Sequence, residues 1–394
     1  MRVLHAPSNI ANQAWTMAQG LRARGHEAYV WHYAPNPYGF PADCVIQHGP
    51  GPDSYLATLH EALDLQPDVV HFHFARSLVP VASGLPWYWD LPVWRARGTK
   101  IVFTFHGSDV RQKSHHLADD PWSYYRFSDV ACDEERIAAQ LSVIRAYADR
   151  TTVGSLLDLP YVPDAVYVPK PVETRRFPVV GPVRRRRPVV VHAPSLRSTK
   201  GTEFVLAAFE RLRSDGAAFE VDLVEGVSHE EVLSHVVDAD VVVDQLLMGE
   251  MGVSSLEAMA LGKVAVARIR DEVRERHPDL PVVSADPDTV VDVLRDLLRS
   301  PARRAELGEQ GRAYVERHHD AAVVGEQLEQ LYLGITPRGA PSIMPGWTAP
   351  RVHERLEHAQ RTVEVLKAKN QELRARIGRP SGVEVLGTTS TPTG

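Results

Sequence analysis

The chain contains 394 residues, of which 44% are hydrophobic and 24% are charged, and its formal net charge is -6. This length suffices for two globular domains and an additional segment, and the negative charge argues against nucleic-acid binding through a basic domain. The two cysteines, Cys44 and Cys132, provide neither a disulfide framework nor a zinc spacing, so we expect a cytoplasmic protein. No stretch approaches the ~20 apolar residues that span a bilayer, which leaves at most peripheral membrane contact.

The first half of the chain alternates short apolar runs with helical patterns. We expect a helix at residues 14–24 and strands at residues 3–4, 28–31, 68–73 and 100–106. The last two runs are continuously apolar until they end in histidines. Continuous apolar strands separated by helices are typical of a parallel sheet buried on both faces, and right-handed crossovers make such a sheet doubly wound.

A proline-rich segment at residues 160–188 separates this pattern from a second one. It includes the arginine run 184–187, which we interpret as a solvated linker; contact with anionic lipid is the alternative. The second pattern predicts strands at residues 189–191, 221–224 and 241–243. It predicts helices at residues 203–213, 230–237, 303–318 and 321–333. We therefore expect an α/β protein with two Rossmann-like doubly wound domains facing a cleft, at residues 1–165 and 166–335.

The C-terminal part has a different character. Residues 336–350 read as a Pro/Gly-rich linker, and residues 379–394 as a disordered tail. Between them, apolar residues recur at spacings of four and three over residues 351–378, with Asn370 at a core position, which is typical of a parallel two-stranded coiled coil. Residues 352–377 would form a homodimer or bind an acidic partner helix; the alternative is an amphipathic helix that folds back onto its own domain.

Arg197 and Lys200 follow the strand at 189–191 and precede the helix at 203–213. A phosphate at this place would meet two cations and the free N–H groups of a helix N-terminus. The same cations would stabilise a diphosphate that departs with developing negative charge. The alternative is a solvated loop in which Gly201 only makes a turn.

A second candidate site follows at residues 249–262. Ser254 and Glu257 match a capping box, in which Ser254 would be the N-cap and Glu257 the third helical residue. The same position would direct the Glu257 carboxylate to vicinal hydroxyls of a ligand, and the two roles are compatible. Gly252 would allow a ligand to approach the backbone closely.

Three histidines stand at strand ends. His106 begins a His-Gly-Ser-Asp sequence that suits an active-site loop, although a histidine at a strand end can be a purely structural group. His71 and His73 share one face of a strand, but no third ligand stands at metal spacing, so we expect no metal site.

These motifs together resemble the family 4 glycosyltransferases, which have the GT-B fold, from residue 1 to about residue 333. The segments that carry the resemblance are 21–30, 69–73, 106–109, 168–177 and 200–260. It implies a metal-independent enzyme without a cofactor that retains anomeric configuration, with the acceptor on the first domain and the nucleotide sugar on the second. It also implies that Lys200 holds the donor diphosphate, that Glu257 holds the ribose hydroxyls, and that His106 lies beside the transferring sugar.

The donor side departs from the family pattern at two places. The family carries two glutamates eight positions apart, and the first place is Gly249 here, with Glu250 beside it. Glu250 replaces that glutamate through a shifted loop, or sugar recognition differs, or transfer is impaired. The family's phosphate-binding arginine stands five positions before the lysine, where this chain has Ser195, whereas Arg197 stands three before it.

The acceptor side departs from the pattern as well. The family's Gly-rich first loop is replaced by residues 7–12. We expect Asn9 and Asn12, together with Asp109, to contact the acceptor, whose identity the sequence does not indicate.

These observations predict a hexosyltransferase that uses a nucleoside-diphosphate sugar. The alternative is a catalytically weakened GT-B scaffold that acts as a binding or assembly protein through its coiled coil. A less favoured alternative is a sugar-nucleotide epimerase with a similar two-domain fold.

Overall fold

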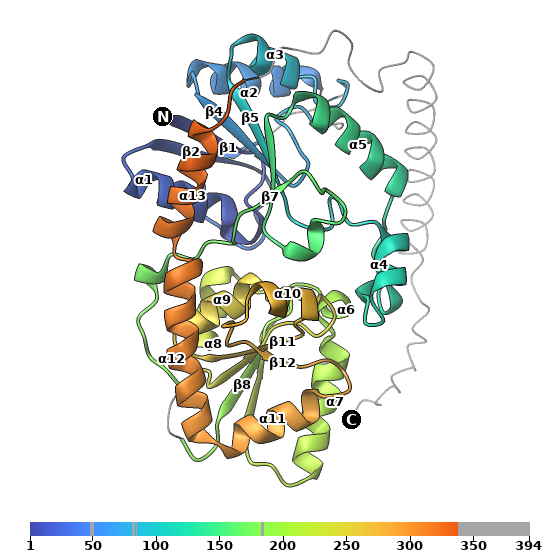
Figure 1. Ribbon diagram of the computed structural model, residues 1–394, viewed down its shortest axis with the longest axis vertical. Coiled ribbons are helices and arrows are strands. Elements are labelled where there is room, and N and C mark those ends of the chain that lie inside the picture. Colours follow the sequence, from blue (N-terminus) through green and yellow to red (C-terminus); the bar gives the residue numbers. More distant parts are fainter. Residues whose placement is uncertain (48–50, 81–82, 84, 183–184, 338–394) are drawn as a thin grey trace, which may run out of the picture. The chain divides into compact units, whose positions relative to one another are not determined.

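The computed structural model describes residues 1–47, 51–80, 83, 85–182 and 185–337. The expected coiled coil at residues 351–378, its linker after residue 337 and the C-terminal tail therefore lie outside the described residues. The described part contains two parallel sheets, each flanked by helices (Figure 1), as the sequence predicts.

The first sheet has seven strands in the order β3-β2-β1-β4-β5-β6-β7, and all of its described pairs are parallel. Its strands are β1 (Arg2–Ala6), β2 (Glu27–Tyr33), β3 (Cys44–Ile46), β4 (Val69–His73), β5 (Lys100–Phe105), β6 (Arg150–Val153) and β7 (Val166–Tyr167). The helices that follow these strands are α1 (Gln13–Ala23), α2 (Pro52–Asp64), α3 (Leu91–Ala96), α4 (Lys113–Asp119) and α5 (Glu134–Tyr147). β4 and all of β5 except its first residue are buried, which agrees with their continuously apolar sequences.

The second sheet has five strands in the order β12-β11-β10-β8-β9, again parallel. Its strands are β8 (Val189–His192), β9 (Glu220–Leu223), β10 (Val241–Val243), β11 (Val264–Ala267) and β12 (Val283–Ser284). Its helices are α6 (Arg197–Lys200), α7 (Thr202–Ser214), α8 (His229–Asp238), α9 (Val253–Ala260), α10 (Asp271–Arg276), α11 (Val290–Arg299) and α12 (Pro301–His318). Two apolar clusters cover its faces, one built around α9 and α12 and the other around α7 and α11.

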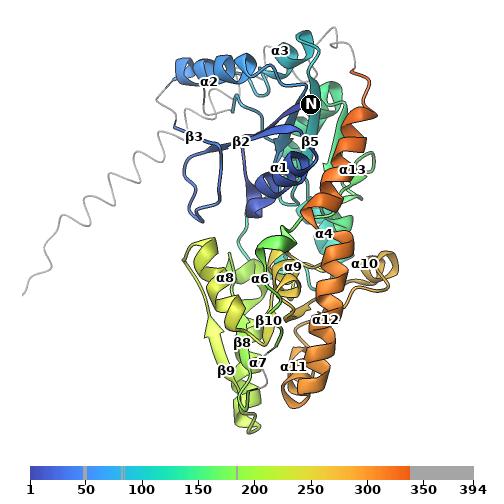
Figure 2. The same ribbon diagram turned by 90° about the vertical axis from the view of Figure 1, so that its left-hand side faces the viewer.

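The chain returns to the first sheet with its last described helix, α13 (Ala321–Leu333). Figure 2 shows α13 beside α1, as Figure 1 does, and its apolar residues join the core of the first sheet. Gly20 and Gly325 allow this close approach, because a Cβ atom on Gly325 would lie 2.6 Å from the Gly20 backbone. Our expectation that residues 321–333 close the second domain was therefore wrong.

The expected boundary between residues 165 and 166 also needs correction. β7 (Val166–Tyr167) pairs with β6 and so belongs to the first sheet. The first Rossmann-like domain thus consists of residues 1–167 together with α13, and the chain passes between the domains twice.

Each sheet has one place where the strand order reverses, between β1 and β4 in the first and between β8 and β10 in the second. Ligands of open α/β sheets bind at the carboxyl ends of strands at such places. The segments that leave β1, β8 and β10 there include residues 7–12, 193–201 and 244–252, which contain most of the candidate residues.

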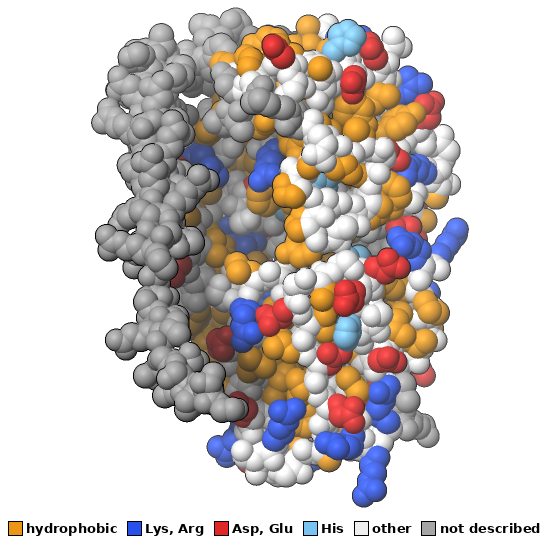
Figure 3. Space-filling view, turned by 180° about the vertical axis from the view of Figure 1, so that it is seen from behind, with side chains coloured by type: hydrophobic (Ala, Val, Ile, Leu, Met, Phe, Trp, Pro, Cys, Tyr) orange, Lys and Arg blue, Asp and Glu red, His pale blue; other side chains and the backbone are white. Residues whose placement is uncertain are grey.

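The surface gives two further observations. On the face in Figure 3, basic and acidic side chains are interspersed. Among the helices of the described residues, none is both long and apolar enough to cross a membrane.

Candidate functional site

Residues of both Rossmann-like domains line two neighbouring cavities. The first, which we call the His106 cavity, is lined by His106 and Arg111 from the first domain and by Glu250 and Gly252 from the second. The second, the Glu257 cavity, is lined by α1 residues and by Glu257. Ala11, Gln13 and Val253 line both. The two cavities therefore form adjacent parts of one site.

His106 stands at the cavity end of a row of buried histidines. Its Nε2 lies 3.1 Å from Nδ1 of His73, and Nε2 of His73 lies 3.0 Å from Nδ1 of His5. Burial and then the nearby Lys170 ammonium lower the pKa of His106 to about 3, and burial lowers that of His5 to about 3. His106 therefore presents a neutral imidazole to the cavity at physiological pH.

The structure places His5 next to His71 and His73, a contact that the sequence did not indicate. Because β1 pairs with β4, ring nitrogens of these three residues lie within 4.8 Å of one another, a spacing compatible with a metal ion. Both nitrogens of His71 are already engaged, Nδ1 with the Tyr332 hydroxyl and Nε2 with the Thr104 hydroxyl, each at 2.6 Å. The arrangement thus favours a hydrogen-bonded histidine cluster.

Asp109 lies in the loop that follows β5. Its Oδ1 accepts a hydrogen bond from the His106 backbone N–H at 2.9 Å, and its Oδ2 is buried without a hydrogen-bond partner among the described residues. Burial raises the pKa of Asp109 to about 7. This residue, which we expected to contact the acceptor, does not line either cavity and instead holds the His106 loop.

The backbone explains why a carboxylate stands at position 250 and not at 249. Gly249 has φ +81°, and a Cβ atom there would lie 2.7 Å from the Arg270 side chain and 3.0 Å from Leu157. Glu250 follows it, lines the His106 cavity, and accepts a hydrogen bond from the Ser155 hydroxyl. Burial raises the pKa of Glu250, although Lys170 and then Ser155 act in the opposite direction.

Lys200 is held at the carboxyl end of the second sheet. Its ammonium donates to Asp244 Oδ1 at 2.7 Å and to Gln245 Oε1 at 2.6 Å. Burial alone would raise the pKa of Asp244, but the Lys200 ammonium keeps it below its ordinary value. Asp244 also accepts the Gly252 N–H at 2.8 Å, and a Cβ atom on Gly252 would lie 2.5 Å from its carboxylate. The close approach of Asp244 therefore requires a glycine at position 252, whether or not a ligand also approaches the backbone there.

Arg197 and Gly201 lie differently from what we expected. Residues 197–200 form the short helix α6, and Arg197 pairs with Glu203 at 2.8 Å and with Glu225 at 2.9 Å on the surface. Gly201, with φ +78°, separates α6 from α7, and Leu246 and Leu247 pack over it. Arg197, Lys200 and Gly201 do not line the two cavities.

The predicted capping box at the start of α9 is wrong. The N-cap is Gly252, so Ser254 is the second helical residue and Glu257 the fifth, and no side chain caps the first turn. Gly252 is favoured there because Asp244 takes its N–H. Glu257 lines its cavity and forms a 2.7 Å hydrogen bond with His229 Nε2.

The two asparagines of the first loop support each other. Asn9 donates to Asn12 Oδ1 at 3.2 Å and to the Pro41 carbonyl at 3.0 Å. Asn12 has φ +62° and lines the Glu257 cavity, whereas Asn9 lines neither cavity. The pair shapes the loop before α1, and Asn12 is the member that reaches the site.

Several cavity residues were not among our predicted site residues. Arg111 and Asp158 form a buried ion pair at 2.7 Å in the His106 cavity. Lys170 lines the same cavity. It belongs to residues 168–177, which we considered only as evidence of the family resemblance. These side chains lie in loops and in the proline-rich segment, where no periodicity marks an inward-facing position.

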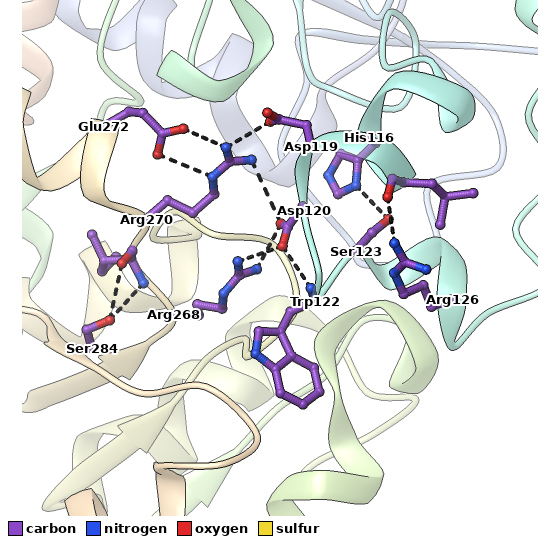
Figure 4. A network of polar contacts seen from close by, with 12 residues as sticks. His116, Asp119, Asp120, Trp122, Ser123, Arg126, Arg268, Arg270, Glu272 and Ser284 are labelled. Atoms are coloured by element: carbon purple, nitrogen blue, oxygen red, sulfur yellow. Dashed lines mark hydrogen bonds and ion pairs between the residues drawn. The ribbon is translucent and has the colours of Figure 1, made fainter.

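A segment of the first domain also contacts the second domain near this site (Figure 4). Arg268, which follows β11, donates to both carboxylate oxygens of Asp120 at 2.9 and 2.6 Å, and Arg270 lies 2.8 Å from Asp119. Nearby, Trp122 packs edge-on against Phe204 of α7. Asp120 is 1% exposed, so its ion pair with Arg268 is a buried contact that joins the end of α4 to the segment after β11.

Comparison with known families identifies both halves of the site. Residues 10–133 match Glycosyltransferase Family 4, and residues 173–330 match a family described as glycosyl transferase-like. The chain is a glycosyltransferase of the GT-B fold. No curated protein matches its sequence.

Solved glycosyltransferase structures share the fold. Sucrose-phosphate synthase from Thermosynechococcus elongatus is 18% identical, with a TM-score of 0.58 over 84% of this chain and 98% of that one. HepE of Anabaena, solved in complex with UDP-glucose, is 11% identical, with a TM-score of 0.56 over 84% and 99%. WaaG, a glycosyltransferase involved in lipopolysaccharide biosynthesis, is 13% identical, with a TM-score of 0.51 over 85% and 100%.

Proposed function

We propose that this glycosyltransferase moves a hexose from a nucleoside-diphosphate sugar to a hydroxyl of an acceptor, with retention of anomeric configuration and without a metal ion. The observation that carries this proposal is the convergence of His106, Glu250 and the uncapped start of α9 on one cavity, beside the Glu257 cavity. The donor sugar would lie in the first cavity and the ribose beside Glu257.

In the proposed reaction, the bond between the anomeric carbon and the diphosphate oxygen breaks, and its electron pair goes to that oxygen. The acceptor hydroxyl oxygen forms the new bond on the same face of the sugar, and its proton passes to the departing diphosphate. The first N–H groups of α9 would stabilise the departing negative charge, and Lys200 would act from outside the cavity through Asp244, which contacts both the Lys200 ammonium and the Gly252 N–H. Neutral His106 would donate or accept a hydrogen bond beside the sugar, and Glu250 would accept from a sugar hydroxyl.

Thermal denaturation with UDP, GDP, ADP and dTDP tests the donor site. A ligand at 100 times its dissociation constant adds ~2.7 kcal/mol to the free energy of unfolding, which raises Tm by a few degrees. We expect one nucleotide to stabilise the wild type and to lose this effect in Lys200→Ala. UDP is the first to test, because HepE was solved with UDP-glucose.

Lys100→Ala is the matched control. It also removes an ammonium, but one that donates to the Tyr332 carbonyl in the first domain, outside both cavities. This variant should keep the nucleotide-dependent shift. If none of the four nucleotides stabilises the wild type, the proposed function is refuted.

A further inference from the structure

Lys170 is fixed in the segment that connects the two sheets. Its ammonium donates to the Met251 carbonyl oxygen at 3.1 Å, and its own carbonyl oxygen accepts from His319 Nδ1 at 2.9 Å. Its aliphatic stem packs on Gly154, where a Cβ atom would lie 3.1 Å from Lys170 Cγ. The side chain lines the His106 cavity, so the structure directs this cation to the place where sugar transfer would occur.

The positive charge of Lys170 is not neutralised by a contacting carboxylate. Within the described part of the chain it forms no ion pair, in contrast to Arg111 in the same cavity, which pairs with Asp158 at 2.7 Å. Arg197, the cation expected near the donor phosphates, pairs with Glu203 and Glu225 and lies outside the cavity. Lys170 is therefore a cation of this cavity that remains available to a ligand.

The backbone next to Lys170 also favours an anion. Met251, whose carbonyl holds the ammonium, is followed by Gly252 and Val253, the N-cap and first residue of α9. No side chain caps this eight-residue helix, and both residues line the cavity. Asp244 takes the Gly252 N–H, but among the described residues no side chain accepts from the next N–H groups of α9. These groups and the helix dipole attract a negative group there, within the same part of the cavity as the Lys170 ammonium.

Of the two carboxylates that line this cavity in the described part of the chain, Asp158 is paired with Arg111, so Glu250 is the one that would oppose an anion. It accepts a hydrogen bond from the Ser155 hydroxyl, which orients it toward the first domain. Burial also raises the pKa of Glu250, against the effect of Lys170. Lys170 and the α9 terminus are thus two attractive groups for an anion, against the one unpaired carboxylate of Glu250.

On the basis of the proposed function, we propose that Lys170 binds the distal phosphate of the donor diphosphate together with the N-terminus of α9. It would take over the role of the phosphate-binding arginine, whose place is occupied by Ser195. When the bond between the anomeric carbon and the distal phosphate oxygen breaks, its electron pair goes to that oxygen, and the Lys170 ammonium stabilises the resulting charge. A nucleoside monophosphate lacks this distal phosphate and so does not reach Lys170.

Titration calorimetry with UDP and UMP, or with the corresponding pair for the base found by thermal denaturation, tests this assignment. In Lys170→Met, which keeps a stem of similar length against Gly154, we expect the affinity for UDP to fall about ten- to hundred-fold, the range of a charge-assisted hydrogen bond. The affinity for UMP should change less than about two-fold, because the missing contact is to the second phosphate. Lys170→Arg should retain UDP binding.

Arg175→Met is the matched control for net charge, since Arg175 is an exposed cation of the same connecting segment that lines neither cavity. It should leave both affinities unchanged. Equal losses for UDP and UMP in Lys170→Met, or no loss for UDP, would overturn the assignment while the donor site itself stands. Absence of nucleotide binding in the wild type would refute the proposed function and this assignment with it.

Discussion

The carboxyl edges of the two sheets contribute different kinds of polar groups to the site. At the edge of the first sheet, His5, His71, His73 and His106 are neutral imidazoles in contact with one another or with hydroxyls. At the edge of the second sheet, Lys200 and Asp244 form a buried ion pair. Both sheets arise from the same alternation of strands and helices, but His5, His71 and His73 lie within β1 and β4, whereas Lys200 and Asp244 follow β8 and β10.

This difference has a chemical consequence. Charged groups at the second sheet suit the phosphates of a nucleotide, whose charge must be met by cations. The neutral imidazoles at the first sheet can exchange hydrogen bonds with hydroxyls without drawing the diphosphate away from its cations, and the charged residues on that side, Arg111 and Asp158, are paired with each other. The comparison therefore supports a donor that is anchored on the second domain and an acceptor that approaches from the first.

The largest expected effect comes from breaking the ion pair of the second sheet. Lys200→Met leaves Asp244, with a side chain 1% exposed, without its cation, and breaking such a buried pair costs about 3–5 kcal/mol of unfolding free energy. The double variant Lys200→Met/Asp244→Asn should recover most of this loss without recovering nucleotide binding. Urea denaturation checks the stability. A double variant as unstable as the single one would contradict the assignment of the cost to the unpaired carboxylate.

The buried histidines at the edge of the first sheet lead us to expect a loss of stability in acid. The pKa of His5 is lowered from 6.5 to about 3 by burial, so its contribution is complete above pH 6.5 and is lost as the pH falls toward 3. This amounts to at most about 1.4 kcal/mol per pH unit. His5→Phe, which keeps a ring in the core, should flatten the decline of unfolding free energy between pH 6.5 and 4.

His60→Phe is the control for this slope, because the His60 side chain is 78% exposed. Its unfolding free energy should follow that of the wild type across the same pH range. If His5→Phe declines as steeply as the wild type, the interpretation of the first edge as a set of buried neutral imidazoles is wrong.

For Asp109 we expect the opposite dependence of the unfolding free energy on pH. Burial raises its pKa from 3.8 to about 7, so its contribution to stability is complete below pH 3.8 and is lost as the pH rises through 7. Asp109→Asn keeps an oxygen for the His106 N–H and should gain stability relative to the wild type between pH 4 and 7, by at most about 1.4 kcal/mol per unit. Parallel curves for the two proteins would show that Asp109 remains charged in the folded state.

The apolar runs predicted β1, β2, β4, β5, β8, β9 and β10, and helical periodicity predicted α7, α8, α12 and α13 closely. The other strands, β3, β6, β7, β11 and β12, were not predicted. Periodicity did not predict that α13 packs on the first sheet, because an apolar helix face does not specify its partner. Similarly, the spacing of His71 and His73 does not show His5, which reaches them only through the pairing of β1 with β4.

The sequence motifs indicated part of the cavity lining, namely Glu250, Gly252 and Glu257, but also Lys200, which lines neither cavity. Local chemistry was less predictable. A serine three positions before a glutamate indicates a capping box, but Asp244 accepts the Gly252 N–H and the helix begins earlier. Lys170 was missed because it stands in a proline-rich segment without periodicity, and only the folded chain brings it to the cavity.

The smallest expected effect concerns Arg197, the cation that we expected near the donor phosphates. Its side chain is 42% exposed and pairs with two glutamates on the surface, and such pairs contribute ~1 kcal/mol or less. Arg197→Ala should therefore lower nucleotide affinity at most about five-fold, far less than Lys200→Met. A loss comparable to that of Lys200→Met would show that Arg197 leaves Glu203 and Glu225 when the donor binds, and the charged edge would then extend to the surface of α6.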